Sequence, residues 1–98
     1  MLPLPERRQR ISKHFDSREK MLDLLIHLQI EVTRTFHFKV REERTPSAFI
    51  NKDGSVFDFS THTKYDVVSL LVDGYMSYST PVPAIDWLEE YVGLSPDA

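Results

Sequence analysis

A turn sequence near the middle of the chain constrains the fold most. Asn51-Lys52-Asp53-Gly54 separates the apolar pair Phe49-Ile50 from the run Ser55-Val56-Phe57-Asp58-Phe59. Asp and Gly tolerate the positive φ angles that a tight, twist-matched turn requires, and Asp-Gly between apolar runs is a strong hairpin signal. The stretch therefore predicts a β-hairpin with arms at about 47–51 and 55–59.

Alternation predicts one more strand before the hairpin. Between residues 33 and 41, one side carries Phe36, Phe38 and Val40, and the other carries His37, Lys39 and Arg41. A period of two is typical of a half-buried strand. We therefore expect this strand to have one apolar face and one basic face.

Three further segments predict helices. The first spans about 17–31 and has a wide apolar face of Met, Leu and Ile side chains. The second spans about 64–73, with Thr63 capping its first turn and Asp66 reaching back to the cap. The third spans about 81–92, begins at Pro81 and ends at Gly93.

These elements predict a single α+β domain over residues 1–98, in which a small three-stranded antiparallel sheet packs with three or four helices. Residues 1–15 are a basic lead-in, and residues 16–94 form the main module. Two interpretations remain open for the basic side chains of the lead-in, which either contact an anion or form a solvated face. These side chains are Arg7, Arg8, Arg10 and Lys13.

Composition limits the class of protein. A hydrophobic fraction of 41% with 28% charged residues is typical of a globular domain, and no apolar run is long enough to cross a bilayer. The chain has no cysteine, which excludes disulfides and thiolate metal sites and agrees with a cytoplasmic location. The N-terminus lacks the apolar core of a signal peptide.

The charge is unevenly distributed along the chain. Residues 1–52 hold eleven Lys or Arg and seven Asp or Glu, a net charge of +4. Residues 53–98 hold one Lys and eight acidic residues, a net charge of −7. Such asymmetry favours a polar partner or self-association, although exposed helices are often acidic without any partner.

No arrangement of residues points to catalysis. The four histidines fall at unrelated spacings, and the three glycines are explained by a turn and two helix ends. Asp86, Glu89 and Glu90 fall on the predicted exposed side of the last helix, where carboxylates usually face only solvent. Because no nucleophile has a neighbouring base, we expect the chain not to be an enzyme.

Two motifs and their spacing resemble a known family. Arg44-Thr45-Pro46-Ser47 precedes the hairpin, and Asp66-Val67-Val68-Ser69-Leu70-Leu71 follows it. This order is similar to the zinc-ribbon domain of bacterial and phage DNA primases, in which a Thr-Pro-Ser-Phe motif, a turn and an Asp-Val-Ile motif follow one another. The resemblance covers about three-quarters of the chain.

The resemblance implies a degenerate zinc ribbon that has lost its metal. The four ligand positions of the family fall on Phe38, Arg41, Asp58 and Thr61, and these side chains do not make a structural zinc site. We therefore expect neither metal nor other cofactor. Burial of the aromatic and aliphatic side chains of the small sheet, each worth about 1.5–3 kcal/mol, is expected to replace the metal. These side chains are Phe36, Phe38, Val56, Phe57 and Phe59.

The resemblance also implies a function. In primases the ribbon helps to select and hold the single-stranded DNA template in front of a catalytic domain. We therefore expect a non-catalytic, DNA-replication-associated module that binds single-stranded DNA weakly. The usual occurrence of this fold suggests a phage or another mobile element as the source.

Basic side chains of the central stretch are the predicted DNA contacts. Such groups neutralise phosphates, and exposed aromatic rings beside them stack on bases. The donors at a Thr63-capped helix terminus would add a further anion site next to Lys64. The predicted nucleic-acid-binding residues are His37, Lys39, Arg41, Arg44, Lys52 and Lys64. The acidic total charge opposes this prediction, because dedicated binders are usually basic.

Two alternatives to DNA binding remain open. In the first alternative, the chain is a protein-interaction adaptor or regulator that kept the fold but lost metal and DNA binding. Its acidic helices then offer a surface for a basic replication protein. In the other alternative, an exposed edge strand or the N-terminal helix joins two copies into a homodimer.

Overall fold

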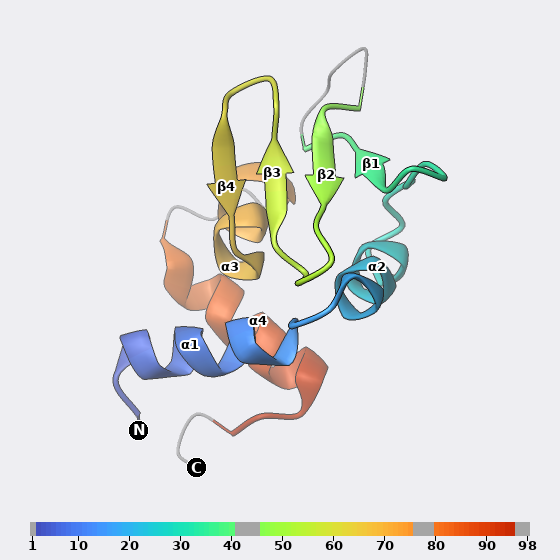
Figure 1. The fold of residues 1–98 in the computed structure, drawn as a ribbon. Coiled ribbons are helices and arrows are strands. Elements are labelled where there is room, and N and C mark those ends of the chain that lie inside the picture. Colours follow the sequence, from blue (N-terminus) through green and yellow to red (C-terminus); the bar gives the residue numbers. More distant parts are fainter. Residues whose placement is uncertain (1, 41–45, 76–79, 96–98) are drawn as a thin grey trace.

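A four-stranded antiparallel sheet and four α-helices make up the fold in this computed structural model, which describes residues 2–40, 46–75 and 80–95. In Figure 1 the strands stand side by side above α1 and α4, and α2 lies next to the end of β2. The elements are α1 (Leu4–His14), α2 (Arg18–His27), β1 (His37–Phe38), β2 (Ala48–Ile50), β3 (Val56–Asp58), β4 (Thr63–Tyr65), α3 (Val67–Leu70), a π-helical turn (Leu71–Tyr75) and α4 (Pro81–Val92). The predicted α+β class is confirmed.

The sheet has the order β1-β2-β3-β4, with every neighbouring pair antiparallel. The predicted hairpin is present, with Ile50 opposite Val56 at the end next to the turn. The sheet has four strands rather than three because Thr63–Tyr65 pairs with β3, where we predicted a helix cap and a first helical turn. Asp66 is the N-cap instead, and its side chain accepts a hydrogen bond from the backbone N–H of Ser69.

One face of the sheet is buried against the helices. Tyr65 and the inward side chains of the other strands pack with apolar side chains from all four helices, and the core is continuous. Fully buried members are Ile11, Leu24, Leu25, Phe38, Val40, Ala48, Ile50, Val56, Val68, Leu70, Leu71, Ala84 and Leu88. The predicted burial of Phe38 and Val40 is therefore confirmed.

Several of the predicted strands and helices are longer than the observed ones. The strand predicted at 33–41 is reduced to β1, because Phe36 has a left-handed backbone with φ of 64° that ends the extended conformation. The helix predicted at 17–31 ends at His27, and Gln29, with φ of 62°, follows it. The helix predicted at 64–73 is replaced by β4, α3 and the π-helical turn. The helix predicted at 81–92 has those bounds, and Gly93 caps it with φ of 79°.

The basic lead-in is a helix that joins the core. Arg7 is only 3% exposed, and its Nε donates to both carboxylate oxygens of Glu89 on α4 at 3.2 Å. Its Nη2 also donates to Asp86 at 2.6 Å. These contacts, first with Glu89 and then with Asp86, raise the pKa of Arg7 above its ordinary value. The prediction that Glu89 faces solvent is wrong, because Glu89 is 3% exposed.

A second ion pair fixes α1 to the start of α3. Arg8 donates from Nε and Nη2 to the two oxygens of Asp66, at 3.0 and 3.1 Å. Burial would raise the pKa of Asp66, but hydrogen bonds from Arg8 and Ser69 outweigh it and hold the pKa below its usual value. The anion site predicted at this helix terminus is therefore occupied by the carboxylate of Asp66.

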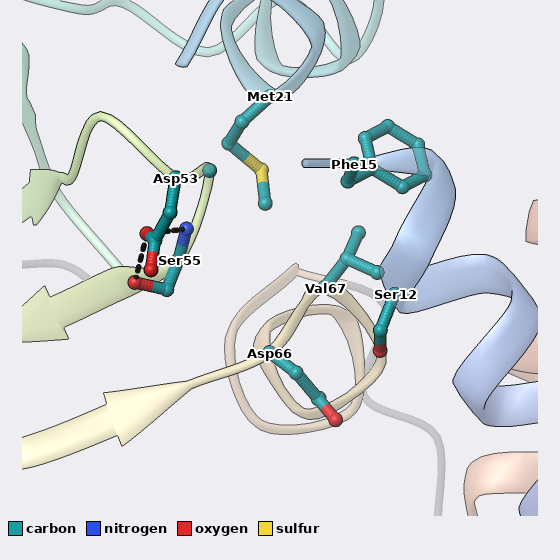
Figure 2. A pocket seen from close by; sticks show the side chains of 8 residues that line it. Ser12, Phe15, Met21, Asp53, Ser55, Asp66 and Val67 are labelled. Atoms are coloured by element: carbon teal, nitrogen blue, oxygen red, sulfur yellow. Dashed lines mark hydrogen bonds between the residues drawn. The ribbon is translucent and has the colours of Figure 1, made fainter. Parts of the chain in front are cut away.

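The turn of the hairpin docks on the link between α1 and α2. The backbone N–H of Arg18 donates to the carbonyl oxygen of Lys52 at 3.1 Å. Figure 2 shows the small pocket beside this contact, with Asp53 and Ser55 of the turn on one side and Met21 and Phe15 on the other. The hairpin and the two N-terminal helices therefore hold one another in place.

Gly54 is required in this turn for two reasons. Its φ is 88°, and a Cβ at this position would collide with the carbonyl oxygen of Phe15 and lie 3.0 Å from that of Ser17. We expect Gly54→Ala to lower the free energy of unfolding by more than about 2 kcal/mol, measured by urea denaturation. Gly93→Ala is the matched control, because its φ is 79° but nothing lies within 4 Å of the added Cβ. It should cost only about 1 kcal/mol, and an equal loss in both variants would show that the collision is relieved without cost.

Candidate nucleic-acid interface

The second face of the sheet carries a row of side chains that crosses all four strands. His37 lies opposite Phe49, Phe49 opposite Phe57, and Phe57 opposite Lys64. Because side chains alternate along a strand, these four project from the face that is turned away from the core. His37, Phe49 and Phe57 are half-buried and Lys64 is exposed. The sheet thus has an open face with three flat rings and a cation at the β4 end.

Arg18 adds a second cation beside this row. Its guanidinium group lies 4.2 Å from the ring centroid of Phe36 and 5.3 Å from that of Phe49. The left-handed backbone of Phe36 turns this ring away from the line of Phe38 and Val40. Arg18 Nε also donates to the carbonyl oxygen of Ile50 at 3.0 Å, which fixes the guanidinium against the sheet.

Ring contacts extend the open face. The rings of His37 and Phe49 are 5.1 Å apart, and the ring of Phe59 packs edge-on against Phe57 at 4.8 Å. Phe59 is 54% exposed. Aromatic rings held in place by their neighbours lose little conformational freedom when another flat group stacks on them.

The structure brings together only some of the predicted site residues. His37 and Lys64 belong to the cross-strand row, and Lys52 lines an open hollow with Arg18 and Phe36 at the edge of that row. Lys39 is exposed but lines a separate hollow with Thr33 and Pro46. The other two predicted contacts, Arg41 and Arg44, lie outside the described residues.

The prediction that five apolar side chains of the sheet are buried is correct for only two of them. Phe38 and Val56 are fully buried, but Phe36 and Phe57 are half-buried and Phe59 is exposed. All five were predicted to lie in the core, because the sequence pattern alone does not show which side chains face the second side of the sheet. The pairing of Phe49 with Phe57 follows from the register of the hairpin, and this register is the sequence signal that would have identified the open face.

The sequence resemblance would place zinc ligands at Phe38 and Asp58, and the surroundings of these residues do not suit a zinc ion. Phe38 is an apolar core residue, and Asp58 lies in the sheet with an exposed fraction of 0%. Oδ1 of Asp58 accepts hydrogen bonds from Ser47 Oγ, Ser60 N and Ser60 Oγ at 2.9, 2.9 and 2.7 Å, while Oδ2 has no partner among the described residues. Burial would raise the pKa of Asp58, but these hydrogen bonds lower it overall.

Hydrogen bonds of Asp58 thus hold two segments of the sheet together. Asp58 connects the start of β2, through Ser47, to the turn between β3 and β4, through Ser60. In the described part of the chain, no three side chains of the ligand types gather as a metal site.

Fold and open face together define a small α+β module whose sheet presents aromatic rings and cations on one side. The chain matches no protein-family model, no curated protein and no solved structure. Within the described segments, no helix combines the length and the apolar composition needed to span a bilayer.

Proposed function

We propose that this chain is a non-catalytic module that holds single-stranded DNA on the open face of its sheet, as the primase-like sequence motifs imply. The observation that carries the proposal is the cross-strand row from His37 to Lys64, with Phe49 and Phe57 between them. Stacking of one base on an aromatic ring contributes about 1–3 kcal/mol and needs no particular base. Only unpaired bases expose the flat faces that such stacking requires.

Cations lie beside the rings at two places. Arg18 lies over Phe36 and Phe49, and Lys52 lines a hollow with Arg18 and Phe36. Lys64 lies opposite Phe57. Phosphates on both sides of two or three stacked bases would then meet a positive charge. Because this chain is acidic overall, with a net charge of −3, we expect the affinity to be weak and strongly dependent on salt.

The test is fluorescence anisotropy of a labelled oligothymidine of about 12 nucleotides, titrated with protein at about 20 and about 150 mM salt. Lys52→Glu/Lys64→Glu is expected to reduce the affinity at low salt at least about ten-fold, because two phosphate contacts become repulsive. Phe59→Ala, a change at an exposed ring, is expected to reduce it about five-fold. A duplex of the same length should bind more weakly than the single strand.

The matched control is Lys13→Glu/Lys20→Glu. These two lysines are exposed and lie on α1 and α2, so the double change alters the net charge equally without touching the open face. The control is expected to keep most of the affinity. The proposal fails if neither salt concentration gives binding, or if both double variants weaken binding to the same extent.

A further inference from the structure

A second aromatic cluster lies away from the open face of the sheet. Trp87 and Tyr91 occupy successive turns of α4, with nearly parallel rings that are 5.4 Å apart and inclined by 9°. On its other side Tyr91 stacks with Phe15 at 6.4 Å, and Phe15 is 5% exposed. The three rings form a column that runs from the core to the surface, so Trp87 and Tyr91 are firmly held.

An open hollow lies beside the outer end of this column. It is lined by His27 from the last turn of α2 and by Trp87, Glu90 and Tyr91 from α4. The ring of His27 is tilted against both others, with centroids 5.0 Å from Tyr91 and 6.2 Å from Trp87. The hollow therefore has aromatic walls that come from two different helices.

Charge determines which ligand suits these walls. Glu90 is exposed and has no ion pair among the described residues, whereas Asp86 and Glu89 of the same helix both bind Arg7. None of the four residues that line the hollow is Lys or Arg. A carboxylate beside aromatic faces attracts a cation and repels the phosphates of a nucleic acid.

We propose that this hollow binds the guanidinium group of an arginine side chain on a partner protein. A guanidinium is planar, stacks on the faces of Trp and Tyr, and donates hydrogen bonds to a carboxylate at its edge. Because Tyr91 is stacked between Trp87 and Phe15, the ring of Trp87 supplies the face, and Glu90 supplies the acceptor. This site is independent of the DNA-binding proposal, because it shares no residue with the open face of the sheet.

Trp87 is the single tryptophan of the chain, so its fluorescence reports directly on the hollow. We expect N-acetylarginine amide to change this fluorescence, and the chemical shift of the indole N–H, in a saturable way with a dissociation constant in the millimolar range. N-acetylcitrulline amide has the same shape without the charge and is expected to bind at least about ten-fold more weakly. Nα-acetyllysine amide, whose side-chain ammonium group is free, is expected to bind less tightly than the arginine amide, because an ammonium group does not stack.

Glu90→Gln is expected to weaken the binding of N-acetylarginine amide about five-fold. Glu31→Gln is the matched control, because Glu31 is exposed and does not line the hollow, and it should leave the affinity unchanged. Equal binding of citrulline, equal binding of lysine, or no effect of Glu90→Gln would overturn the proposal. A change of Trp87 fluorescence with oligothymidine but not with the arginine amide would overturn it too, and would assign the hollow to bases.

Discussion

Glu89→Ala is expected to lower the free energy of unfolding by about 3–5 kcal/mol, because Arg7 would keep its charge in the core without its main partner. The side chains of both residues are at most 4% exposed, so water does not replace the lost carboxylate. Asp86, the other partner of Arg7, is 62% exposed and cannot supply a buried counter-charge. Urea denaturation followed by circular dichroism measures the loss.

Two further variants separate a lost ion pair from a damaged helix. Glu90→Ala changes the next residue of α4, which is exposed, and should cost less than about 0.5 kcal/mol. Arg7→Met/Glu89→Leu removes both charges and should recover most of the stability lost in Glu89→Ala, since replacing a buried pair by apolar groups is often nearly neutral. A loss below about 1 kcal/mol in Glu89→Ala would mean that the guanidinium reaches solvent when Glu89 is absent.

Phe38→Ala is the second substitution expected to have a large effect, with a loss of about 3–5 kcal/mol in the free energy of unfolding. Phe38 has an exposed fraction of 0% and is among the largest fully buried side chains of the core. It also stands where the resemblance to primase ribbons places the first metal ligand. The cost comes from lost burial and from the cavity that the missing ring would leave.

Phe59→Ala is the control for this change, because the same ring is removed from a position that is 54% exposed. It should cost less than about 1 kcal/mol. Thermal unfolding measures both variants on the same scale. Equal losses would contradict the idea that Phe38, rather than aromatic content in general, stabilises the fold.

Local patterns in the sequence predicted the parts of the fold that are fixed locally. Asp53-Gly54 marks the hairpin turn, and Pro81 and Gly93 mark both ends of α4. The strand β4 was missed because Thr63 and Asp66 also have the spacing of a helix cap, and three residues are too few to show alternation. Here pairing with β3 outweighs the local preference.

Local sequence patterns could not predict contacts between residues that are far apart in the chain. Arg7 and Glu89 both look like exposed charges in their own helices, and only the packing of α1 on α4 brings them together. At the candidate site, Lys64 and His37 were predicted individually, but their position at opposite ends of one row depends on the register of four strands. Arg18 was not predicted, and Phe36 was predicted only as a core residue, because the left-handed turn that brings them together has no simple sequence signature.

The buried pair between α1 and α4 has a consequence for synthesis of the protein. Arg7 and Glu89 are separated by 82 positions in the chain, so a ribosome makes nearly every other element before the acid that neutralises Arg7 exists. Until α4 emerges, α1 carries a cation that has no buried counter-charge and an apolar side that α4 does not yet cover. The hairpin is formed from neighbouring residues and is able to pair early, whereas closure of the core waits until α4 has been made. A nascent chain stalled before α4 would therefore expose apolar surface, and it is the species on which a chaperone would act.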